Sequence, residues 1–547
     1  MPSPLALLPH VSVSVLALLP TLHAQAVTLL EGLPGDARSV RVIRTDGTAA
    51  TLLPQVHLRA IALNGRTTNH VGELDRVRLL EADDRQWIER PDGARLFVYE
   101  RTDVTGHGLL LVPTDGFARV VYEADHQLDV PIGVGTDGRH VVFAHGDEVT
   151  VVRLDGVFAD TGLTHRSVTL AGGDALGASI VVGPTHAFFV ADDDEVFRLG
   201  LHAGATPIRV TDGTGAEQAE NLTLSGNGNV AAFLRSHWTD QFAVWVVGDT
   251  GPARRLDLPE RQYLQPAYLP GQTGEPNLLL ADDGSRLVVT EQQTERELFH
   301  CETGLGGIAT QITPDAVFSD YIGVHILPRW SGDRLLFASG HEGWSDWYVR
   351  HADGTVENLT QTGSPEPPFL VGSLDVRARW ALGNGTALAT EGLGTLERLR
   401  HLDPAGSTHL LFDDLVTPPK AGSALTGTPD LRVVGLGGER LVGGQHGDVL
   451  LALPAGIDLC DPIRSANGVT ALYAHVGGVV GVLALRLPDG TILLGAPSLG
   501  VPQLTWTAAG ELVLAWPDRL QVLTVSGATD LPQPAGGARV LLSGARS

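Results

Sequence analysis

Five histidines of this sequence lie in similar short polar stretches that also contain glycine or carboxylates. They are His107, His145, His237, His341 and His446, in the segments Thr105-Gly106-His107-Gly108, Ala144-His145-Gly146-Asp147-Glu148, Ser236-His237-Trp238-Thr239-Asp240, Gly340-His341-Glu342-Gly343 and Gln445-His446-Gly447-Asp448. Neutral imidazole together with carboxylate is a ligand set for divalent Zn, Mn or Fe, and the same groups serve general acid–base catalysis. His, Gly and Asp are also ordinary residues of exposed polar turns. A divalent metal site and a set of plain turn residues are therefore both open.

Two other groups of residues have binding chemistry. Acidic stretches recur at 191–195, 281–284 and 412–414. Clustered carboxylates suit Ca²⁺, but the EF-hand spacing is absent, which favours solvated turns. Trp238 and Trp344 lie in or next to polar loops, where aromatic side chains serve as binding anchors. Cys301 and Cys460 belong to no CxxC motif, so we expect two buried free thiols, with a bridge between them as the alternative.

The elements that would position these residues follow from a repeat of turns. Gly93, Gly138, Gly183 and Gly228 follow one another at intervals of 45 residues by subtraction. Less regular members come at 283–284, 331–333, 383–385, 437–438, 477–478 and 509–510. We interpret each as the turn between the first and second strands of a unit, because a short apolar run follows it. In that scheme the five histidines lie between second and third strands. A period of 40–50 residues of strand and turn is typical of propeller blades.

The clearest unit is residues 329–360. Trp330 ends a short extended segment, residues 334–339 have strand composition, and further strands are expected at 347–349 and 356–360. Asp-Gly at 353–354 favours a hairpin turn, because glycine accepts the positive φ that such turns need. A four-stranded antiparallel unit of this kind cannot bury both of its faces, so it needs neighbours of the same kind.

A family resemblance rests on this unit. Residues 328–339 read P-R-W-S-G-D-R-L-L-F-A-S, followed by G-W-S-D-W-Y-V and A-D-G-T-V-E-N-L-T. This pattern resembles the blade repeat of TolB-like β-propellers (the PD40 or WD40-like repeat), which also builds the N-terminal propellers of prolyl-oligopeptidase-type peptidases. The resemblance implies a propeller fold, and TolB-like propellers include metal-dependent sugar-acid lyases with clustered histidines. The sequence has no Gly-x-Ser-x-Gly elbow, so the peptidase resemblance transfers no catalytic residue.

We therefore predict an all-β fold: a β-propeller of four-stranded antiparallel blades with about ten repeat units, as one large ring or two tandem rings. Residues 86–416 would be TolB-like blades and residues 417–547 degenerate C-terminal blades, with the Pro-rich segment 417–422 as the best internal boundary. Residues 27–85 form an N-terminal β segment that would close the ring against the C-terminal blade and remove an exposed edge.

Residues 1–26 have features of a secretory signal. Residues 11–19 are mostly apolar and 24–26 read Ala-Gln-Ala, a small-x-small cleavage form. The first ten residues lack Lys and Arg, and Val-Ser-Val-Ser-Val alternates as a strand does. We expect a periplasmic or secreted protein, with a cytoplasmic one as the alternative. No apolar run reaches the length of a membrane helix.

Composition limits the partners. The 38 basic and 63 acidic residues give a net charge of −25, which repels phosphate backbones and argues against nucleic-acid binding. We expect a non-enzymatic binding or scaffold propeller with a protein or peptide partner. The alternatives are a metal-assisted lyase or hydrolase that acts on a polar substrate at the His-bearing loops, and the propeller part of a peptidase system whose catalytic domain is encoded separately.

Overall fold

The computed structural model describes an all-β chain. It covers residues 26–540 apart from gaps at 32–36, 45–47, 60–77, 83–84, 91, 105, 114–116, 125–127, 129–131, 171–174, 192–193, 213–217, 237–241, 259–277, 291–297, 305–308, 313–328, 340–345, 360–374, 382–386, 394–395, 404–408, 413–416, 422–431, 436–438, 444–447, 461, 466, 507–509, 517–518, 525–526 and 531–537. The described residues form strands and turns and contain no helix. The all-β prediction is confirmed. Within the described part, no helical segment could cross a membrane.

Consecutive strands pair as antiparallel meanders. The strands of the first half are β1 (Ala26–Glu31), β2 (Arg38–Arg44), β3 (Ala49–Leu58), β4 (Arg78–Ala82), β5 (Arg85–Glu89), β6 (Arg95–Arg101), β7 (Gly106–Val112), β8 (Arg119–Ala124), β9 (Gly133–Val134), β10 (His140–His145), β11 (Glu148–Arg153), β12 (His165–Thr169), β13 (Ala175–Val182), β14 (His186–Ala191), β15 (Val196–Gly200), β16 (Ile208–Arg209), β17 (Gln218–Leu224), β18 (Val230–Ser236), β19 (Ala243–Gly248), β20 (Arg254–Arg255), β21 (Leu278–Leu280), β22 (Arg286–Thr290), β23 (Leu298–Glu302) and β24 (Ala309–Gln311). Those of the second half are β25 (Arg329–Ser331), β26 (Arg334–Ser339), β27 (Asp346–Arg350), β28 (Val356–Asn358), β29 (Asp375–Ala381), β30 (Ala387–Leu393), β31 (Leu396–Leu402), β32 (His409–Phe412), β33 (Thr417–Ala421), β34 (Arg432–Gly435), β35 (Glu439–Gly443), β36 (Asp448–Ala452), β37 (Asp458–Leu459), β38 (Ile463–Arg464), β39 (Thr470–Val476), β40 (Val480–Arg486), β41 (Ile492–Leu494), β42 (Ser498–Leu499), β43 (Gln503–Trp506), β44 (Leu512–Ala515), β45 (Leu520–Thr524), β46 (Gly527–Asp530) and β47 (Ala538–Val540).

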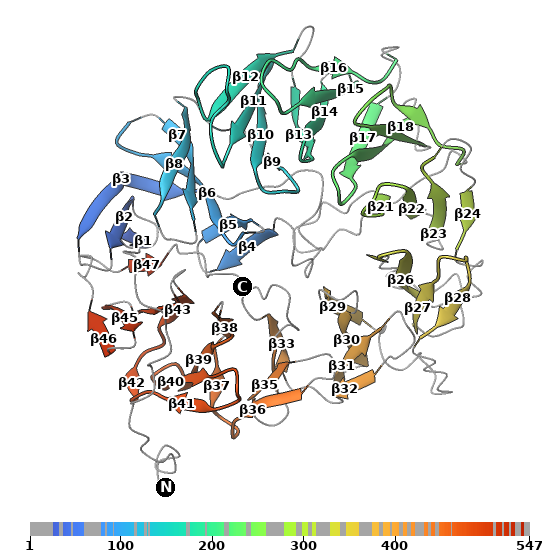
Figure 1. Ribbon diagram of the computed structural model, residues 1–547. Helices are drawn as coiled ribbons and strands as arrows, with labels where there is room; N and C mark the ends of the chain where they lie inside the picture. The colour runs from blue at the N-terminus through green and yellow to red at the C-terminus, as the bar shows by residue number, and fades with distance from the viewer. Residues whose placement is uncertain are drawn as a thin grey trace.

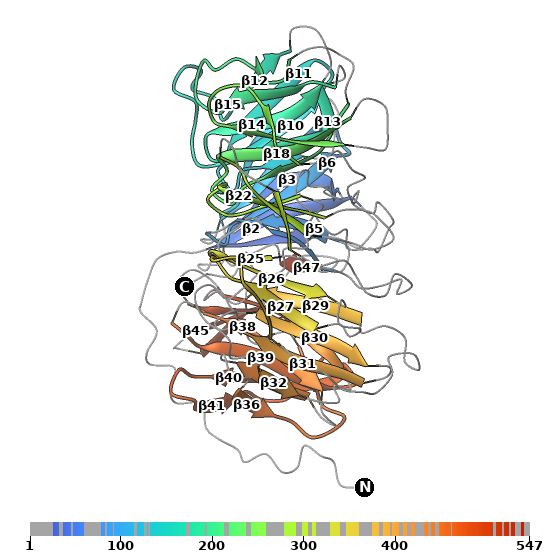
Figure 2. The same ribbon diagram turned by 90° about the vertical axis from the view of Figure 1, so that its right-hand side faces the viewer.

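Most sheets have four strands, as predicted. Among the described residues, eight sheets are four-stranded, one is six-stranded and one is nine-stranded. The unit expected at 329–360 is the sheet β25-β26-β27-β28. Figure 1 shows the sheets one after another around a circle in chain order, with β9, β13, β17 and β21 toward the centre and β24 and β28 outside. Turned by 90°, the molecule is much narrower (Figure 2). This radial order of small antiparallel sheets is the architecture of a β-propeller.

The first and last described strands meet in one sheet. Strand β1 pairs with β2 along its length and with β47 on its other edge, where Leu29 lies opposite Val540. Strand β3 continues this meander and then pairs with β6, where Val56 lies opposite Arg101. Gln55, with a φ of 49°, lies where the register of the β2–β3 pair shifts. The nine-stranded sheet therefore joins β47-β1-β2-β3 to the meander β5-β6-β7-β8.

Tight Asp-Gly turns begin many of the hairpins. In Arg90-Pro91-Asp92-Gly93, Gly93 has a φ of 83° and its N–H donates to the Arg90 carbonyl over 2.9 Å. The Asp92 carboxylate accepts the N–H of Ala94 over 3.0 Å. The same side-chain bond occurs at Asp137, Asn227, Asp283, Asp353 and Asp489. The repeat seen in the sequence is thus a repeated turn geometry, in which glycine supplies positive φ and the preceding side chain caps the turn.

Antiparallel pairing places the turns of each sheet alternately at its two ends. We call the end with the turns between strands one and two, and three and four, the first-turn face. The end with the turn between strands two and three is the second-turn face. Two predicted turns are assigned wrongly in this scheme. Residues 437–438 separate β34 from β35, and residues 477–478 separate β39 from β40, which are second and third strands of their sheets. A Gly-Gly pair signals a turn but does not say which one.

The Pro-rich segment at 417–422 contains a strand. Residues Thr417–Ala421 form β33, the first strand of its sheet. The register with β34 is irregular between Thr417 and Lys420, where Pro418 and Pro419 lie. Proline cannot donate to a strand ladder, and it is tolerated here because β33 is an edge strand with a bulge.

The inner strands of neighbouring sheets contribute alternate residues to two cores, one on each side of the sheet. Val141 and Phe143 of β10 pack with Val98 and Leu109 of the preceding sheet. Their neighbours Val142 and Ala144 pack instead with residues of the following sheet, such as Ile180. The same alternation continues through three further interfaces up to Trp330, Phe337 and Tyr348. Because successive side chains point to opposite faces, a strand buried on both sides reads as a continuous apolar run.

Backbone approach between neighbouring sheets is very close at one pair of first turns. A Cβ added to Gly183 would lie 2.1 Å from the carbonyl oxygen of Gly228. Gly228 has a φ of 75°, and a Cβ there would lie 2.3 Å from Cδ of Pro184. Glycine is therefore required at 183 by the neighbouring sheet, and at 228 by both its turn and that neighbour.

A buried ion pair links the sheets β13–β16 and β17–β20. Arg235 is fully buried, and its Nη2 lies 3.2 Å from Oε1 of Glu195, whose side chain is 1% exposed. Thr211 donates its hydroxyl to the other carboxylate oxygen of Glu195. Nη1 of Arg235 also contacts Asp212 at 2.9 Å. Glu195 belongs to the acidic stretch expected as a solvated turn. That expectation is wrong for Glu195, because the carboxylate is used to bind the next blade.

We expect Arg235→Ala to lower the free energy of unfolding by about 3–5 kcal/mol, because it leaves the Glu195 carboxylate buried without its partner. The measurement is denaturant unfolding of the full chain. Arg101→Ala is the matched control: Arg101 pairs with Asp103 and Glu123 at a partly exposed position, so its loss should cost less than about 1 kcal/mol. Equal losses in the two variants would contradict the assignment.

Gly183→Ala should destabilise the protein by about 1–3 kcal/mol, because the new methyl group overlaps the Gly228 carbonyl and the two sheets must separate. The control is Gly304→Ala, where an added Cβ meets no atom within 4 Å and the change should stay within about 0.5 kcal/mol. Thermal unfolding of both variants tests this, and a neutral Gly183→Ala would show that the turns do not touch.

Candidate functional site

Two of the five predicted histidines lie in the described part of the chain. His107 is in strand β7 and His145 ends strand β10. His237, His341 and His446 lie outside the described residues, as do Trp238 and Trp344. The strands that flank position 446, β35 and β36, are the third and fourth of their sheet. Position 446 therefore lies between the third and fourth strands of its sheet, whereas the prediction placed it between the second and third.

His107 differs from the exposed loop residue expected. It is 8% exposed and lies opposite Glu100 in the β6–β7 pair. Its Nε2 is 4.0 Å from Oε1 of Glu100, whose other oxygen accepts from Arg59 over 2.9 Å. The strand begins earlier than predicted because Gly108 fits against Tyr99: a Cβ there would lie 2.5 Å from the Tyr99 hydroxyl. Glycine here indicated close packing rather than a loop.

His145 has the expected exposed position at a tight hairpin. It lies opposite Glu148, and Gly146 between them has a φ of 58°. Among the described residues, no group of three or more His, Cys, Asp or Glu side chains is placed to hold a metal ion. Because three of the five histidines fall outside this part of the chain, the divalent-metal hypothesis stays a prediction.

The cysteine prediction is largely confirmed. Cys301 and Cys460 are both free thiols. Cys301 is buried, and burial raises the pKa of its thiol to about 11. Cys460 is partly exposed, so only one of the two is fully buried.

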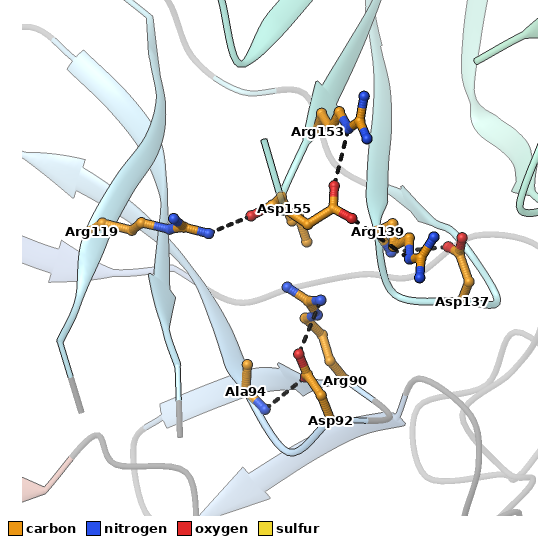
Figure 3. Close-up of polar contacts among 9 residues, drawn as sticks. Arg90, Asp92, Ala94, Arg119, Asp137, Arg139, Arg153 and Asp155 are labelled. Carbon is orange, nitrogen blue, oxygen red and sulfur yellow. Dashed lines mark hydrogen bonds and ion pairs between the residues drawn. The ribbon is translucent and has the colours of Figure 1, made fainter. Parts of the chain in front are cut away.

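A group of charged side chains gathers on the first-turn face, where the sequence suggested only turns (Figure 3). We call it the turn-side cluster, and its members are Arg90, Asp92, Arg119, Asp137, Arg139, Arg153 and Asp155. They come from two neighbouring sheets. The β5–β6 turn and the start of β8 belong to one, and the β9–β10 turn and the end of β11 belong to the other. Antiparallel pairing brings all four chain segments to the same end of the sheets.

The cluster is held by short polar contacts. Nη2 of Arg90 lies 3.1 Å from Oδ2 of Asp92. Asp155 accepts from Nε of Arg153 over 3.1 Å, and its other oxygen lies 3.6 Å from Nε of Arg139. Burial of Asp155 opposes its ionisation, but the hydrogen bond and charge of Arg153, with the charge of Arg139, outweigh it and lower its pKa.

One contact of the cluster crosses between the sheets. Arg119 donates from Nη2 to the carbonyl of Leu154 over 2.7 Å. The next sheet boundaries have comparable bonds, from Arg166 to the Ala205 carbonyl and from Arg198 to the carbonyls of Gly248 and Gly251. Arg119 therefore fixes the relative position of the two sheets that carry the cluster.

The arginines of the cluster retain N–H groups that could bind a ligand. Arg90 uses one guanidinium nitrogen and Arg139 uses only Nε, and neither makes a further side-chain hydrogen bond to the described residues. The arrangement is suited to binding an anionic group, since guanidinium N–H groups match carboxylate and phosphate oxygens. The sequence carried a signal for this site: arginines flank the turns at 92–93, 137–138 and 155–156. Which of these turns are neighbours could not be read from it.

Comparisons with known proteins give a distant likeness only. No protein-family model matches the sequence, and no curated protein matches it. The chain is similar to the structure of a putative TolB from Agrobacterium tumefaciens, at 14% identity and a TM-score of 0.26, over 54% of this chain and 84% of that one. It is similar to TolB from Acinetobacter baumannii at 12% identity and a TM-score of 0.25, over 78% and 79%. Dipeptidyl peptidase 4 from Porphyromonas gingivalis gives 10% identity and a TM-score of 0.40, over 88% of this chain and 60% of the peptidase.

At these identities and scores the likeness assigns neither a family nor a function to this chain. The propeller architecture of this chain is established by its own strand order and by the arrangement in Figure 1. The chain spans 60% of the length of the peptidase it matches.

Buried histidines lie at the interfaces between blades. His140, next to Arg139 of the cluster, is 9% exposed, and its Nδ1 has no hydrogen-bond partner among the described residues. Burial lowers its pKa, which the carboxylates of Asp137 and Asp155 oppose. His300 is 7% exposed and packs edge-on against Trp330 of the next blade. Burial, with the charges of Arg350 and Arg286, lowers the pKa of His300 to about 4.

The His300 imidazole should make stability depend on pH. Its folded pKa of about 4 lies below the ordinary 6.5, so the unfolded chain binds the proton first. Neutral His300 makes its full contribution to the free energy of unfolding above pH 6.5. This contribution is lost as pH falls toward 4, by about 1–2 kcal/mol after allowance for solvent screening. As pH falls from 6.5 to 4, we expect the native chain to lose its advantage in unfolding free energy over His300→Gln. Parallel pH profiles for the two proteins would contradict the burial of a neutral imidazole.

Proposed function

We propose that this protein is a non-enzymatic binding or scaffold β-propeller that presents one rigid face to a protein or peptide partner. The observation that carries the proposal is the turn-side cluster. Its guanidinium groups come from two blades joined by the Arg119 bond, and Arg90 and Arg139 keep N–H groups without partners among the described residues. Arginine is enriched at binding interfaces and is costly to replace there.

The proposal takes the molecule as a single closed ring. Ten units follow one another from β5 to β46, and β47-β1-β2-β3 forms a further unit between the last and the first. In this interpretation residues 86–416 supply the TolB-like blades, residues 417–547 the later blades, and residues 27–85 the segment that closes the ring. The pairing of β1 with β47 supports one ring over two tandem rings, because it joins the two ends of the whole chain.

The charge of the chain indicates the kind of partner. A net charge of −25 attracts basic proteins and peptides over long distances and repels nucleic acids. We therefore propose a partner segment with net positive charge. We place the encounter in the periplasm or outside the cell, on the basis of the signal-like residues 1–26.

A binding experiment with the full chain tests the proposal. A library of random-sequence peptides, each anchored through its N-terminus, is offered to the labelled protein, and the captured peptides are sequenced. We expect saturable capture of a minority with net positive charge, since they complement the acidic surface. Mass spectrometry of the captured peptides should find every one chemically intact.

The control is a second library of the same length with net negative charge, which should not be captured. Equal capture of both libraries, or no capture of either, would contradict a binding function for this chain. Cleaved or modified peptides would show that it is an enzyme.

A further inference from the structure

The turn-side cluster is a local excess of positive charge on an acidic protein. It contains four arginines, Arg90, Arg119, Arg139 and Arg153, and three aspartates, Asp92, Asp137 and Asp155. With all carboxylates ionised, the seven side chains have a net charge of +1, by subtraction of three from four. The whole chain has −25. An anionic group of a partner would therefore meet attraction here and repulsion over most of the remaining surface.

The carboxylate oxygens of the cluster make more hydrogen bonds and ion pairs than its guanidinium nitrogens do, relative to the number that each could make. Asp92 accepts from the N–H of Ala94 with one oxygen and pairs with Arg90 through the other. Asp155 uses one oxygen for Arg153 and the other for Arg139. On the cationic side, Nη1 of Arg90 and both Nη atoms of Arg139 make no hydrogen bond to the described residues. The cluster thus has N–H donors that can bind a ligand, because most of its own carboxylate oxygens are already engaged.

Arg90 is the fixed member of the cluster. It is 8% exposed, and its Nε is buried without an acceptor among the described residues. Its one ionic partner among the described residues, Asp92, has a side chain that is 56% exposed. A buried guanidinium with so few acceptors is costly unless another anion comes close. In Figure 3 the Arg90 guanidinium points toward Asp155, which pairs with the exposed Arg139 of the next blade.

We propose that the turn-side cluster binds a single carboxylate of the partner, through Arg90 of one blade and Arg139 of the next. The planar forks of arginine match the two oxygens of a carboxylate. One carboxylate brings the net charge of the cluster to zero, whereas a doubly charged phosphate exceeds it. This inference rests on the proposed binding function. It adds that a basic partner must present one carboxylate, from its C-terminus or from an Asp or Glu side chain, at the point of contact.

The test uses the peptides captured from the library by the full chain. Each is made with a free C-terminus, with a C-terminal amide, and with its Asp and Glu residues replaced by Asn and Gln. Fluorescence anisotropy measures their dissociation constants for the native chain, Arg139→Gln and Arg90→Gln. We expect removal of the responsible carboxylate to weaken binding about tenfold. Arg139→Gln should weaken binding of the parent peptide several-fold. It should weaken binding of the peptide that lacks the carboxylate only a little further.

Arg139 is the safer of the two substitutions, because its side chain is 62% exposed and the variant should fold as the native chain does. Arg59→Gln is the matched control on the second-turn face and should leave binding unchanged. The amide and the Asn/Gln forms distinguish a C-terminal carboxylate from a side-chain one.

Each other outcome is decisive. Peptides that bind equally well without any carboxylate, or losses that are fully additive with Arg139→Gln, would overturn the carboxylate site and leave the binding function standing. Inorganic phosphate that displaces the peptide more strongly than acetate at equal ionic strength would also overturn it. If no peptide is captured at all, the proposed binding function itself fails.

Discussion

The sheets from β9 to β24 each have two apolar faces, and neither face can be left in water. This constraint determines the arrangement of the whole chain. In β10, Val141 and Phe143 pack against the sheet before, while Val142 and Ala144 pack against the sheet after. A sheet with this pattern is stable only between two others, because burial of apolar surface is the main source of its stability. A row of such sheets must therefore close on itself or leave an uncovered face at each end. Strand β1 pairs with β47, so strands from both ends of the described chain share one sheet.

Polar contacts then determine how neighbouring sheets are aligned. The Glu195–Arg235 pair, the arginine bonds to carbonyls of the next sheet and the contact between Gly183 and Gly228 each join two consecutive units. They have a consequence for function. Because the sheets are held in register, side chains on neighbouring first turns keep fixed positions relative to one another. The turn-side cluster depends on this, since its arginines come from two sheets and acquire a common position only through the packing between them.

Local signals in the sequence were sufficient for the strands and for most first turns. Asp-Gly at 92–93 and 137–138 predicts a tight turn because only glycine accepts the required φ without strain, and the turn forms there. Contacts between units were beyond such reasoning. His107 was expected in a loop, yet it lies in a strand because Gly108 accommodates the ring of Tyr99. Glu195 was expected in water, yet it pairs with an arginine 40 residues later, as the numbering gives by subtraction. The arginines beside the first turns were visible in the sequence, but their gathering depends on which turns are neighbours in space.

The central claim is that the sheets cover one another around one ring, which the first and last strands close. The most direct test is a disulfide between those strands. Glu31 and Ala538 lie opposite each other in the β1–β47 pair, and cysteines at directly opposed positions of antiparallel strands are close enough to bridge. In the variant Glu31→Cys with Ala538→Cys, peptide mapping after mild oxidation should find a bridge between these two positions within a monomeric chain. A chain in which these cysteines stay reduced, or bridge only to a second molecule, would contradict the closed ring.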